Sequence, residues 1–277
     1  MTLRNTTLSA LSVGLLLASF SGTASADSCT PAHRFSTIEP GTLTVSAHPY
    51  PPFSVPAGGS VGGVDGDIAK QIAAKECLKV KFLVVDPSAV IQAVVAGKAD
   101  LAIGDWQRTA ARAKVLGLSA PLYVEQVGFI SKDGVDTVAA LQGKRVGSVQ
   151  GYFWTGDLQK LLGGSLTVYP NPVAMAQDLA AGRLDVGTDA YSVVEYDQKK
   201  GGYQGLQVKV VKPDPKLSAS MMPSQAGFPY TKANDGLGQA LSDDINGMHK
   251  SGEIAKILKA NGVPVSAGDV GAPRLLQ

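Results

Sequence analysis

The stretch QAVVAGKAD at residues 92–100 returns in similar form as QDLAAGRLD at residues 177–185. Each copy is typical of a helix, a glycine that stops it, and a strand that starts with an aspartate. The copies lie 85 residues apart, which predicts two lobes of similar α/β build, with coincidence as the alternative for so short a turn. Because ligands bind beyond the carboxyl ends of strands in open α/β sheets, we expect Asp105 and Asp189 on opposite walls of one cleft.

The remainder of the chain alternates strand-like and helix-like runs. We expect strands at 43–46, 81–85, 99–104, 145–149, 166–169, 184–188 and 206–211, and helices at 68–75, 89–96, near 156–162, from 171 onward, and twice near the end of the chain, along 237–248 and 254–258. Such alternation predicts an α/β fold in which a mostly parallel sheet carries helices on its faces.

Composition excludes several classes of protein. The 277 residues are 44% hydrophobic and 17% charged, with a formal net charge of +2, a globular profile rather than a disordered one. No block of like charge is present, so we expect neither a nucleic-acid partner nor a polybasic membrane surface. His33, His48 and His249 lack metal-ligand spacing, and we predict no metal or cofactor. Without a nucleophile elbow, P-loop or dinucleotide motif, the sequence nominates no catalytic residue and favours a binding protein over an enzyme.

The first 26 residues have the pattern of a secretory signal peptide. Arg4 precedes an apolar run over 8–20, and Ala24 and Ala26 follow at A-x-A spacing, which predicts cleavage after Ala26 and export. The run has 13 residues, fewer than the roughly 20 that span a bilayer. A lipoprotein signal ending at Cys29 is the weaker alternative. In an oxidising compartment Cys29 and Cys77 are expected to pair, with two separate thiols as the alternative.

Eight short motifs follow one another in order along nearly the whole mature chain. They are GTLTV (41–45), YPPF (50–53), GVDGDIA (63–69), AGKADL (96–101), TAAR (109–112), LSAPLY (118–123), LQGKRVG (141–147) with QG (150–151), and GRLD (182–185). Each is weak alone, but together they resemble the family 3 bacterial extracellular solute-binding proteins, the amino-acid-binding components of ABC importers. The resemblance implies a type II periplasmic-binding-protein fold, with two lobes joined by two crossover strands. Lobe 1 would comprise 41–129 plus 225–277, and lobe 2 would comprise 130–224.

The same resemblance implies a periplasmic receptor, which we expect to be a monomer. It would capture a small amino-acid-like zwitterion or cation by hinge closure and deliver it to an ABC permease. Two alternatives remain at this point: a periplasmic enzyme on the same scaffold, similar to a cyclohexadienyl dehydratase, and an accessory or sensor binding module.

Roles for five residues follow from the motifs. The resemblance implies that Arg112 clamps the α-carboxylate of the ligand, for which a planar guanidinium is suited. Thr109 is expected to cap the short helix that carries Arg112, with a secondary part in binding. Asp189 is the candidate for the α-ammonium, although it follows Asp185 one residue sooner than in the family. Tyr50 would lie against the ligand, whereas Phe53 is expected to pack more into its lobe.

Two segments depart from the family pattern and set the expected ligand chemistry. Residues 104–108 read GDWQR and residues 151–154 read GYFW, so hydroxyls that help to hold a carboxylate in the family are missing. Both tryptophans of the chain lie in these segments, which predicts an aromatic cage suited to a cation or to a flat apolar group, rather than to an acidic amino acid. The candidate ligand-binding residues are Tyr50, Phe53, Asp105, Trp106, Gln107, Thr109, Arg112, Tyr152, Phe153, Trp154 and Asp189.

Overall fold

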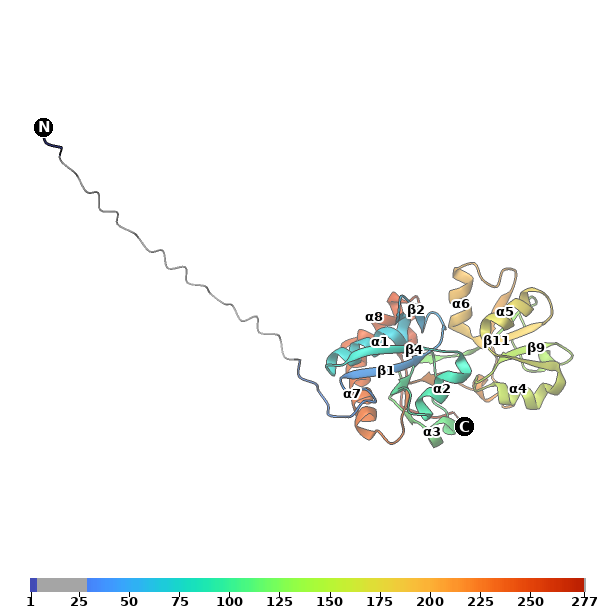
Figure 1. Ribbon diagram of the computed structural model, residues 1–277. Helices are drawn as coiled ribbons and strands as arrows, with labels where there is room; N and C mark the ends of the chain where they lie inside the picture. The colour runs from blue at the N-terminus through green and yellow to red at the C-terminus, as the bar shows by residue number, and fades with distance from the viewer. Residues whose placement is uncertain (4–28, 277) are drawn as a thin grey trace.

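Two α/β lobes lie side by side in the computed structural model, which describes residues 1–3 and 29–276. Figure 1 shows α1, α2, α3, α7 and α8 in one lobe and α4, α5 and α6 in the other. The predicted signal peptide lies almost entirely outside the described residues. Within the described chain, no helix combines the length and apolar character needed to cross a membrane.

Fourteen strands and eight α-helices are present in the described residues. The strands are β1 (Thr42–Ala47), β2 (Val55–Ala57), β3 (Ser60–Gly62), β4 (Lys79–Val84), β5 (Leu101–Ala102), β6 (Gly117–Leu118), β7 (Tyr123–Glu125), β8 (Val127–Ser131), β9 (Val146–Val149), β10 (Leu166–Tyr169), β11 (Val186–Ala190), β12 (Gln207–Val210), β13 (Ser224–Ala226) and β14 (Pro229–Tyr230). The helices are α1 (Gly63–Lys75), α2 (Pro87–Val95), α3 (Ala110–Val115), α4 (Thr155–Leu162), α5 (Pro172–Ala180), α6 (Tyr191–Lys199), α7 (Asp235–Ser251) and α8 (Glu253–Ala260).

The sheet of the first lobe has the order β4-β1-β5-β14-β6. β1 is parallel to both β4 and β5, whereas β14 is antiparallel to β5 and β6, so a single strand opposes the other four. β1 is buried along its whole length, as expected for a central strand with helices on both faces. The apolar sides of α1, α7 and α8 form one core on this sheet, and α2 forms a second core with Trp106.

The second sheet repeats this arrangement with the order β10-β9-β11-β8-β12. β9 is parallel to β10 and β11, and β8 is antiparallel to β11 and β12. Asn171 caps α5, because its side-chain oxygen accepts a hydrogen bond from the Ala174 amide at 2.9 Å and Pro172 occupies the first helical turn. Each sheet is therefore mostly parallel, and the two-lobed α/β fold predicted from the sequence is confirmed.

Two short strands connect the lobes. β7 and β13 pair antiparallel, with Tyr123 opposite Ala226 and Glu125 opposite Ser224. β7 runs on toward β8 of the second sheet, and β13 runs on toward β14 of the first. This ribbon connects the lobes, and we call it the hinge because two-lobed proteins close about such segments.

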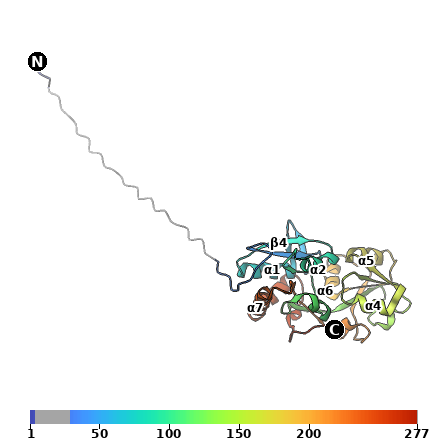
Figure 2. The same ribbon diagram turned by 60° about the horizontal axis from the view of Figure 1, so that its bottom comes forward.

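The C-terminal segment lies against this hinge, and the C-terminus is beside the junction of the lobes in both ribbon views (Figure 1, Figure 2). The Gln225 side chain on β13 donates hydrogen bonds to the carbonyls of Val270 and Ala272 at 2.7 and 2.9 Å. The Arg274 guanidinium donates to the Pro223 carbonyl at 2.6 Å. The segment therefore ties the end of the chain to one of the two crossover strands.

Cys29 and Cys77 form a disulfide, as predicted, with their Cα atoms 5.7 Å apart. The bond links the start of the described mature chain to the turn that follows α1. Cys77 has φ +58°, a left-handed backbone conformation.

Several expected boundaries differ from the observed ones. β11 begins at Val186 instead of 184, because Asp185 pairs with Arg145 before the strand starts. The predicted lobe boundaries, 41–129 with 225–277 and 130–224, stay a prediction, but β8 already belongs to the second sheet from Val127.

Candidate functional site

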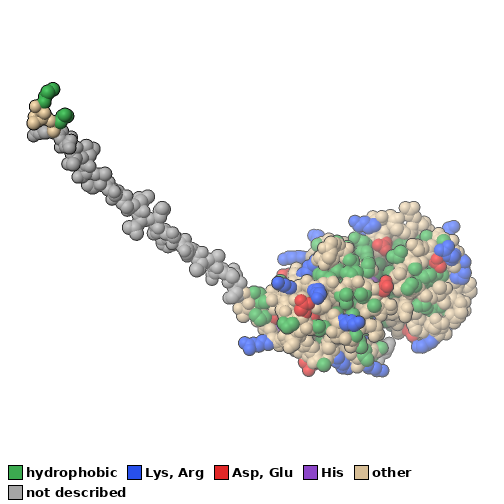
Figure 3. Space-filling view, in the orientation of Figure 1, with side chains coloured by type: hydrophobic (Ala, Val, Ile, Leu, Met, Phe, Trp, Pro, Cys, Tyr) green, Lys and Arg blue, Asp and Glu red, His purple; other side chains and the backbone are tan. Residues whose placement is uncertain are grey.

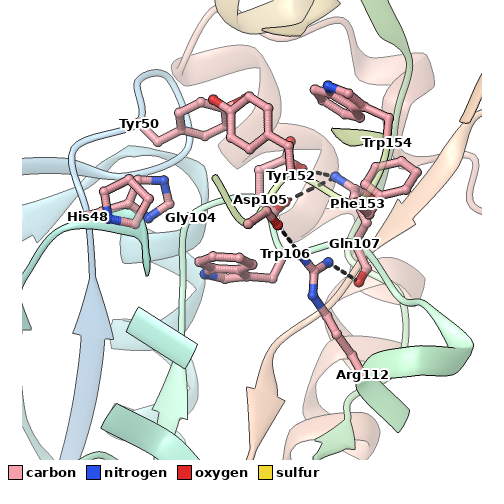
Figure 4. A pocket seen from close by; sticks show the side chains of 12 residues that line it. His48, Tyr50, Gly104, Asp105, Trp106, Gln107, Arg112, Tyr152, Phe153 and Trp154 are labelled. Atoms are coloured by element: carbon pink, nitrogen blue, oxygen red, sulfur yellow. Dashed lines mark hydrogen bonds between the residues drawn. The ribbon is translucent and has the colours of Figure 1, made fainter. Parts of the chain in front are cut away.

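A small pocket of about 20 Å³ opens between the lobes. Figure 4 shows its side chains converging from the loops that follow β1, β5 and β9. Its lining residues are His48, Tyr50, Pro87, Gly104, Asp105, Trp106, Gln107, Arg112, Gly151, Tyr152, Phe153 and Trp154. The pocket thus joins both segments that depart from the family pattern, one from each lobe.

Arg112 reaches the pocket from α3 and contacts both lobes. Its Nη1 donates to the Gln107 carbonyl at 2.6 Å, and its Nη2 donates to the Gly151 carbonyl of the second lobe at 3.1 Å. The guanidinium carbon also lies 4.9 Å from the ring centre of Trp106, a cation–π distance. Burial lowers the pKa of Arg112 to about 10, so the side chain stays charged at neutral pH.

Asp105 occupies the floor of the pocket in a left-handed conformation, with φ +58°. Its carboxylate accepts a hydrogen bond from the Gln107 side chain at 2.6 Å. Asp65, at the start of α1, fixes this turn by accepting the amides of Gly104 and Asp105 at 2.8 and 2.9 Å. Burial raises the pKa of Asp65 to about 6. It also raises the pKa of Asp105 well above its ordinary value, and the charges of Glu125 and Asp65 add to this shift.

Asp189 lies at the end of β11 and is fully buried. Its Oδ1 accepts hydrogen bonds from the hydroxyls of Tyr50 in the first lobe and Tyr152 in the second, the latter at 3.0 Å. Its Oδ2 is buried and has no hydrogen-bond partner among the described residues. Burial raises the pKa of Asp189 to about 6. The carboxylate therefore links the lobes through Tyr50 and keeps one acceptor free for another donor.

A fourth buried carboxylate, Glu125, belongs to the crossover strand β7. It accepts hydrogen bonds from the Gln126 amide at 2.8 Å and from the hydroxyl of Ser192 at the start of α6. Burial raises its pKa to about 7. The hinge itself thus carries an acid whose charge influences Asp105 and Asp189.

Aromatic rings form much of the pocket wall. Tyr152 and Phe153 both meet Trp154 edge-on, with ring centres 4.9 and 5.0 Å apart. Trp154 is nearly buried and donates its indole N–H to the Thr188 hydroxyl at 3.2 Å, so this wall is anchored to the sheet of the second lobe. Figure 4 shows Tyr50 and Tyr152 directed toward each other from the two lobes.

Most sequence-predicted residues meet at this pocket, but three do not line it. Phe53 is fully buried and stacks on Tyr123 at 4.6 Å inside the first lobe. Thr109 caps α3, where its hydroxyl accepts the Arg112 amide at 3.2 Å. Asp189 lines a neighbouring groove instead, which it shares with Tyr50.

The sequence interpretation missed His48, Asp65 and Glu125. The sequence places His48 only among the histidines without metal-ligand spacing, but its side chain lines the pocket, 5.3 Å from Tyr50 and 5.6 Å from Trp106 between ring centres. Burial lowers its pKa to about 4, so it is neutral at physiological pH. Its place two residues before Tyr50 of the YPPF motif is the sequence signal that could have identified it.

Comparisons with known proteins agree with this architecture. The family model of bacterial extracellular solute-binding proteins, family 3, matches residues 43–262. A lysine/arginine/ornithine-binding periplasmic protein of Escherichia coli (strain K12) is 30% identical over 156 residues, covering 54% of this chain and 58% of that protein. This match therefore spans less than two thirds of that relative. A histidine-binding periplasmic protein of Salmonella typhimurium (strain LT2) is 25% identical over 269 residues, covering 90% of this chain and 95% of that protein.

Solved structures show the same fold. An ancestral arginine-binding protein bound to arginine has a TM-score of 0.69 and 25% identity, covering 80% of this chain and 98% of that chain. An amino acid ABC transporter substrate-binding protein from Streptococcus pneumoniae, bound to L-arginine, has a TM-score of 0.71 and 24% identity, covering 80% of this chain and 94% of that chain. The family match covers most of the sequence, and the chain belongs to the family 3 bacterial extracellular solute-binding proteins.

Proposed function

We propose that this protein is a periplasmic receptor that captures a small amino-acid-like cation between its lobes and delivers it to an ABC permease. Family membership supports the solute-binding role and the periplasmic location. The basic ligands named for the relatives, lysine, arginine, ornithine and histidine, support a cation. We also propose that the signal peptide is cleaved after Ala26, that the protein is a monomer, and that its partner is an ABC permease.

The observation that carries the choice of a cation is the free acceptor on Asp189. A fully buried carboxylate oxygen without a partner is costly, and a ligand ammonium would satisfy it. The aromatic rings of Tyr50, Tyr152 and Trp106 add faces that attract positive charge.

Closure would follow from contacts that a ligand makes with both lobes. Arg112 of the first lobe already reaches Gly151 of the second, and Tyr50 reaches Asp189. A ligand that touches both walls binds the closed arrangement more tightly and shifts the population toward it. The permease would then recognise the closed form.

Calorimetric titration with a panel of basic, neutral and acidic amino acids tests this proposal. We expect basic ligands to bind most tightly, and Asp189→Asn to weaken them about 10- to 100-fold, since a hydrogen bond to a charged group is lost. Asp133→Asn, an exposed position on the second lobe, is the matched control and should bind like the wild type. Tight binding of glutamate alone would contradict the proposal, and aromatic product from prephenate or arogenate would favour the enzyme alternative.

A further inference from the structure

A groove of about 810 Å³ adjoins the pocket, and Tyr50 lines both. The pocket itself, at about 20 Å³, has room for little more than one water molecule. Small-molecule sites in proteins commonly measure roughly 300–1,000 Å³. The groove therefore offers the ligand-sized space that the pocket lacks in this arrangement of the lobes.

Two helices of the second lobe form the walls of this groove. On α5, Val173, Ala176 and Ala180 lie three and four residues apart, so they share one face of the helix. Val193 of α6 and Leu206, just before β12, add further apolar lining. Val173 keeps 64% of its surface exposed. The groove thus presents apolar surface to any molecule that occupies it.

One buried acid supplies the groove with a hydrogen-bond acceptor. Asp189 is fully buried and lines the groove. Its Oδ1 accepts hydrogen bonds from the hydroxyls of Tyr50 and Tyr152 and from the Ala190 amide, whereas its Oδ2 has no partner in the described chain. An ammonium group on an occupant of the groove would satisfy Oδ2 with a charge-assisted hydrogen bond.

A lysine lies at the opposite end of α6 from this acid. Asp189 precedes the helix and Lys200 follows it, and both line the groove. The Lys200 ammonium lies 5.7 Å from the ring centre of Tyr196 and forms no salt bridge within the described part of the chain. It is therefore available to a carboxylate.

The separation of these two charges sets the length of the ligand. At about 1.5 Å per residue, the nine residues of α6 hold Asp189 and Lys200 roughly 14 Å apart along the helix axis. The ammonium and carboxylate of a single α-amino acid share one carbon atom and cannot reach both. A peptide extends by up to about 3.5 Å per residue, so two or three residues span this distance with the reach of the lysine side chain.

Amide side chains complete the lining. Gln177 of α5 and Gln204, in the segment after α6, also line the groove. A glutamine amide both donates and accepts hydrogen bonds, as a peptide bond does. Apolar walls with amides among them, an acceptor at one end and a cation at the other fit a peptide better than a single amino acid.

We propose that this groove binds a short peptide of two or three residues, with its N-terminal ammonium at Asp189, apolar side chains on α5 and its carboxylate directed toward Lys200. This inference rests on the proposed function, because it keeps the ammonium site at Asp189, and it extends the ligand from an amino acid to a peptide. Pro49, Tyr50 and Pro51 of the first lobe line the same groove, so a peptide there touches both lobes and favours closure.

Calorimetric titration with lysine, Lys-Gly-Gly and Lys-Leu-Leu tests the inference, at about pH 8 so that Asp189, with a pKa of about 6, is ionised. We expect Lys-Leu-Leu to bind about tenfold or more tightly than the other two, because its leucines bury apolar surface in the groove. Lysine or Lys-Gly-Gly that binds as tightly as Lys-Leu-Leu would overturn this inference and leave the proposed function standing. Absence of binding by all three would overturn both.

Variants that fill the groove locate the peptide. Ala176→Trp should remove the advantage of Lys-Leu-Leu over lysine and leave lysine within about threefold of its wild-type affinity. Ala180→Trp, at an exposed position of the same helix face, repeats the test if the first variant does not fold. Gln159→Trp, exposed on α4 and outside the groove, is the control and should keep the advantage. An unchanged advantage in a folded groove variant would overturn the placement.

The carboxylate end has a readout of its own. Lys200→Gln should weaken Lys-Leu-Leu about threefold, the modest effect of an exposed ion pair, and leave the C-terminal amide of the same peptide unaffected. Lys199→Gln removes the same charge at a neighbouring position that does not line the groove, and it should change neither. Equal effects of Lys200→Gln on the acid and the amide would overturn the assignment of Lys200.

Discussion

At the residue scale, Gly104 and His48 are packed so closely that neither position tolerates added volume. A Cβ on Gly104 would lie 2.6 Å from the His48 ring, and Gly104 has φ +118°, in the region that favours glycine. We expect Gly104→Ala to destabilise the protein by about 2 kcal/mol or more and to weaken ligand binding, as measured by urea unfolding and calorimetric titration.

Gly97→Ala is the matched control for this prediction. Gly97 also has positive φ, +66°, but open space surrounds its missing side chain. Its substitution should cost about 1 kcal/mol from backbone strain alone and leave binding intact. Equal losses in the two variants would show that the contact with His48 does not matter.

Tyr50 connects the lobes through a single hydroxyl. Tyr50→Phe removes the hydrogen bond to Asp189 and preserves the ring. We expect an affinity about 3- to 10-fold weaker than that of the wild type and a larger radius of gyration in solution scattering without ligand. Tyr196→Phe, on α6, is a control for which neither quantity should change.

Individual residues were predicted well where the reason was local. The cap at Thr109 follows from its place before α3, and the structure contains that hydrogen bond. His48 and Glu125 were missed because their positions depend on contacts between distant segments, such as β1 with the loop after β5 and β7 with α6. A single sequence does not display those contacts.

At the scale of elements, the disulfide constrains the unfolded chain more than it shapes the site. Cys29 and Cys77 are 48 residues apart, for which the chain-entropy view gives about 4 kcal/mol of stabilisation. We expect the double variant Cys29→Ser, Cys77→Ser to lose about 2–4 kcal/mol in urea unfolding, with ligand affinity unchanged, because the bond lies outside the pocket. Equal stability of the oxidised and reduced proteins would contradict this.

Elements with regular apolar spacing were located to within a few residues, whereas short or polar ones were not. α7 and α8 follow the predicted stripes, and their buried faces contain the expected leucines and isoleucines. α6 was not predicted, because its sequence YSVVEYDQK mixes β-branched and aromatic residues that are not strong helix formers. β6 and β14 have two residues each, too few for any periodicity to appear.

At the scale of the whole molecule, the buried acids predict a pH dependence. Burial raises the pKa values of Asp65 and Asp189 to about 6 and that of Glu125 to about 7. The folded protein therefore holds these three protons more tightly than the unfolded chain does. The resulting stabilisation is fully present below about pH 4, where the unfolded carboxyls are also protonated, and it is lost as pH rises through about 6 to 7.

A bound cation favours the ionised carboxylates, so binding should release protons and tighten as pH rises from about 5 to about 8. Burial also raises the pKa of Asp105 in the pocket, so this carboxyl acts in the same direction. His48, Tyr50, Tyr152 and Arg112 do not titrate in that window: burial keeps His48 neutral with a pKa of about 4, raises the pKa values of both tyrosines, and leaves Arg112 charged with a pKa of about 10. The ligand-induced rise in Tm should be larger at high pH, measured by scanning calorimetry. An affinity that falls with pH would contradict this prediction.

The two-lobed fold was predictable from the sequence, but the set of side chains that face the cleft was predictable only in part. The repeat at 92–100 and 177–185 indicates two similar units, and one copy lies in each lobe. Figure 3 shows Lys and Arg side chains scattered over the visible face, in keeping with the nearly balanced charge. The concentration of buried carboxylates between the lobes depends on how the sheets meet, which composition does not reveal.

The chain contains two tryptophans, and Trp106 and Trp154 both lie in the wall of the pocket, one on each lobe. Their indole emission therefore originates entirely at the proposed ligand site, with no indole background from elsewhere in the protein. Arrival of a cation beside these rings should change the intensity or wavelength of that emission. Intrinsic tryptophan fluorescence of the unmodified protein can therefore follow ligand binding in a titration without any attached dye.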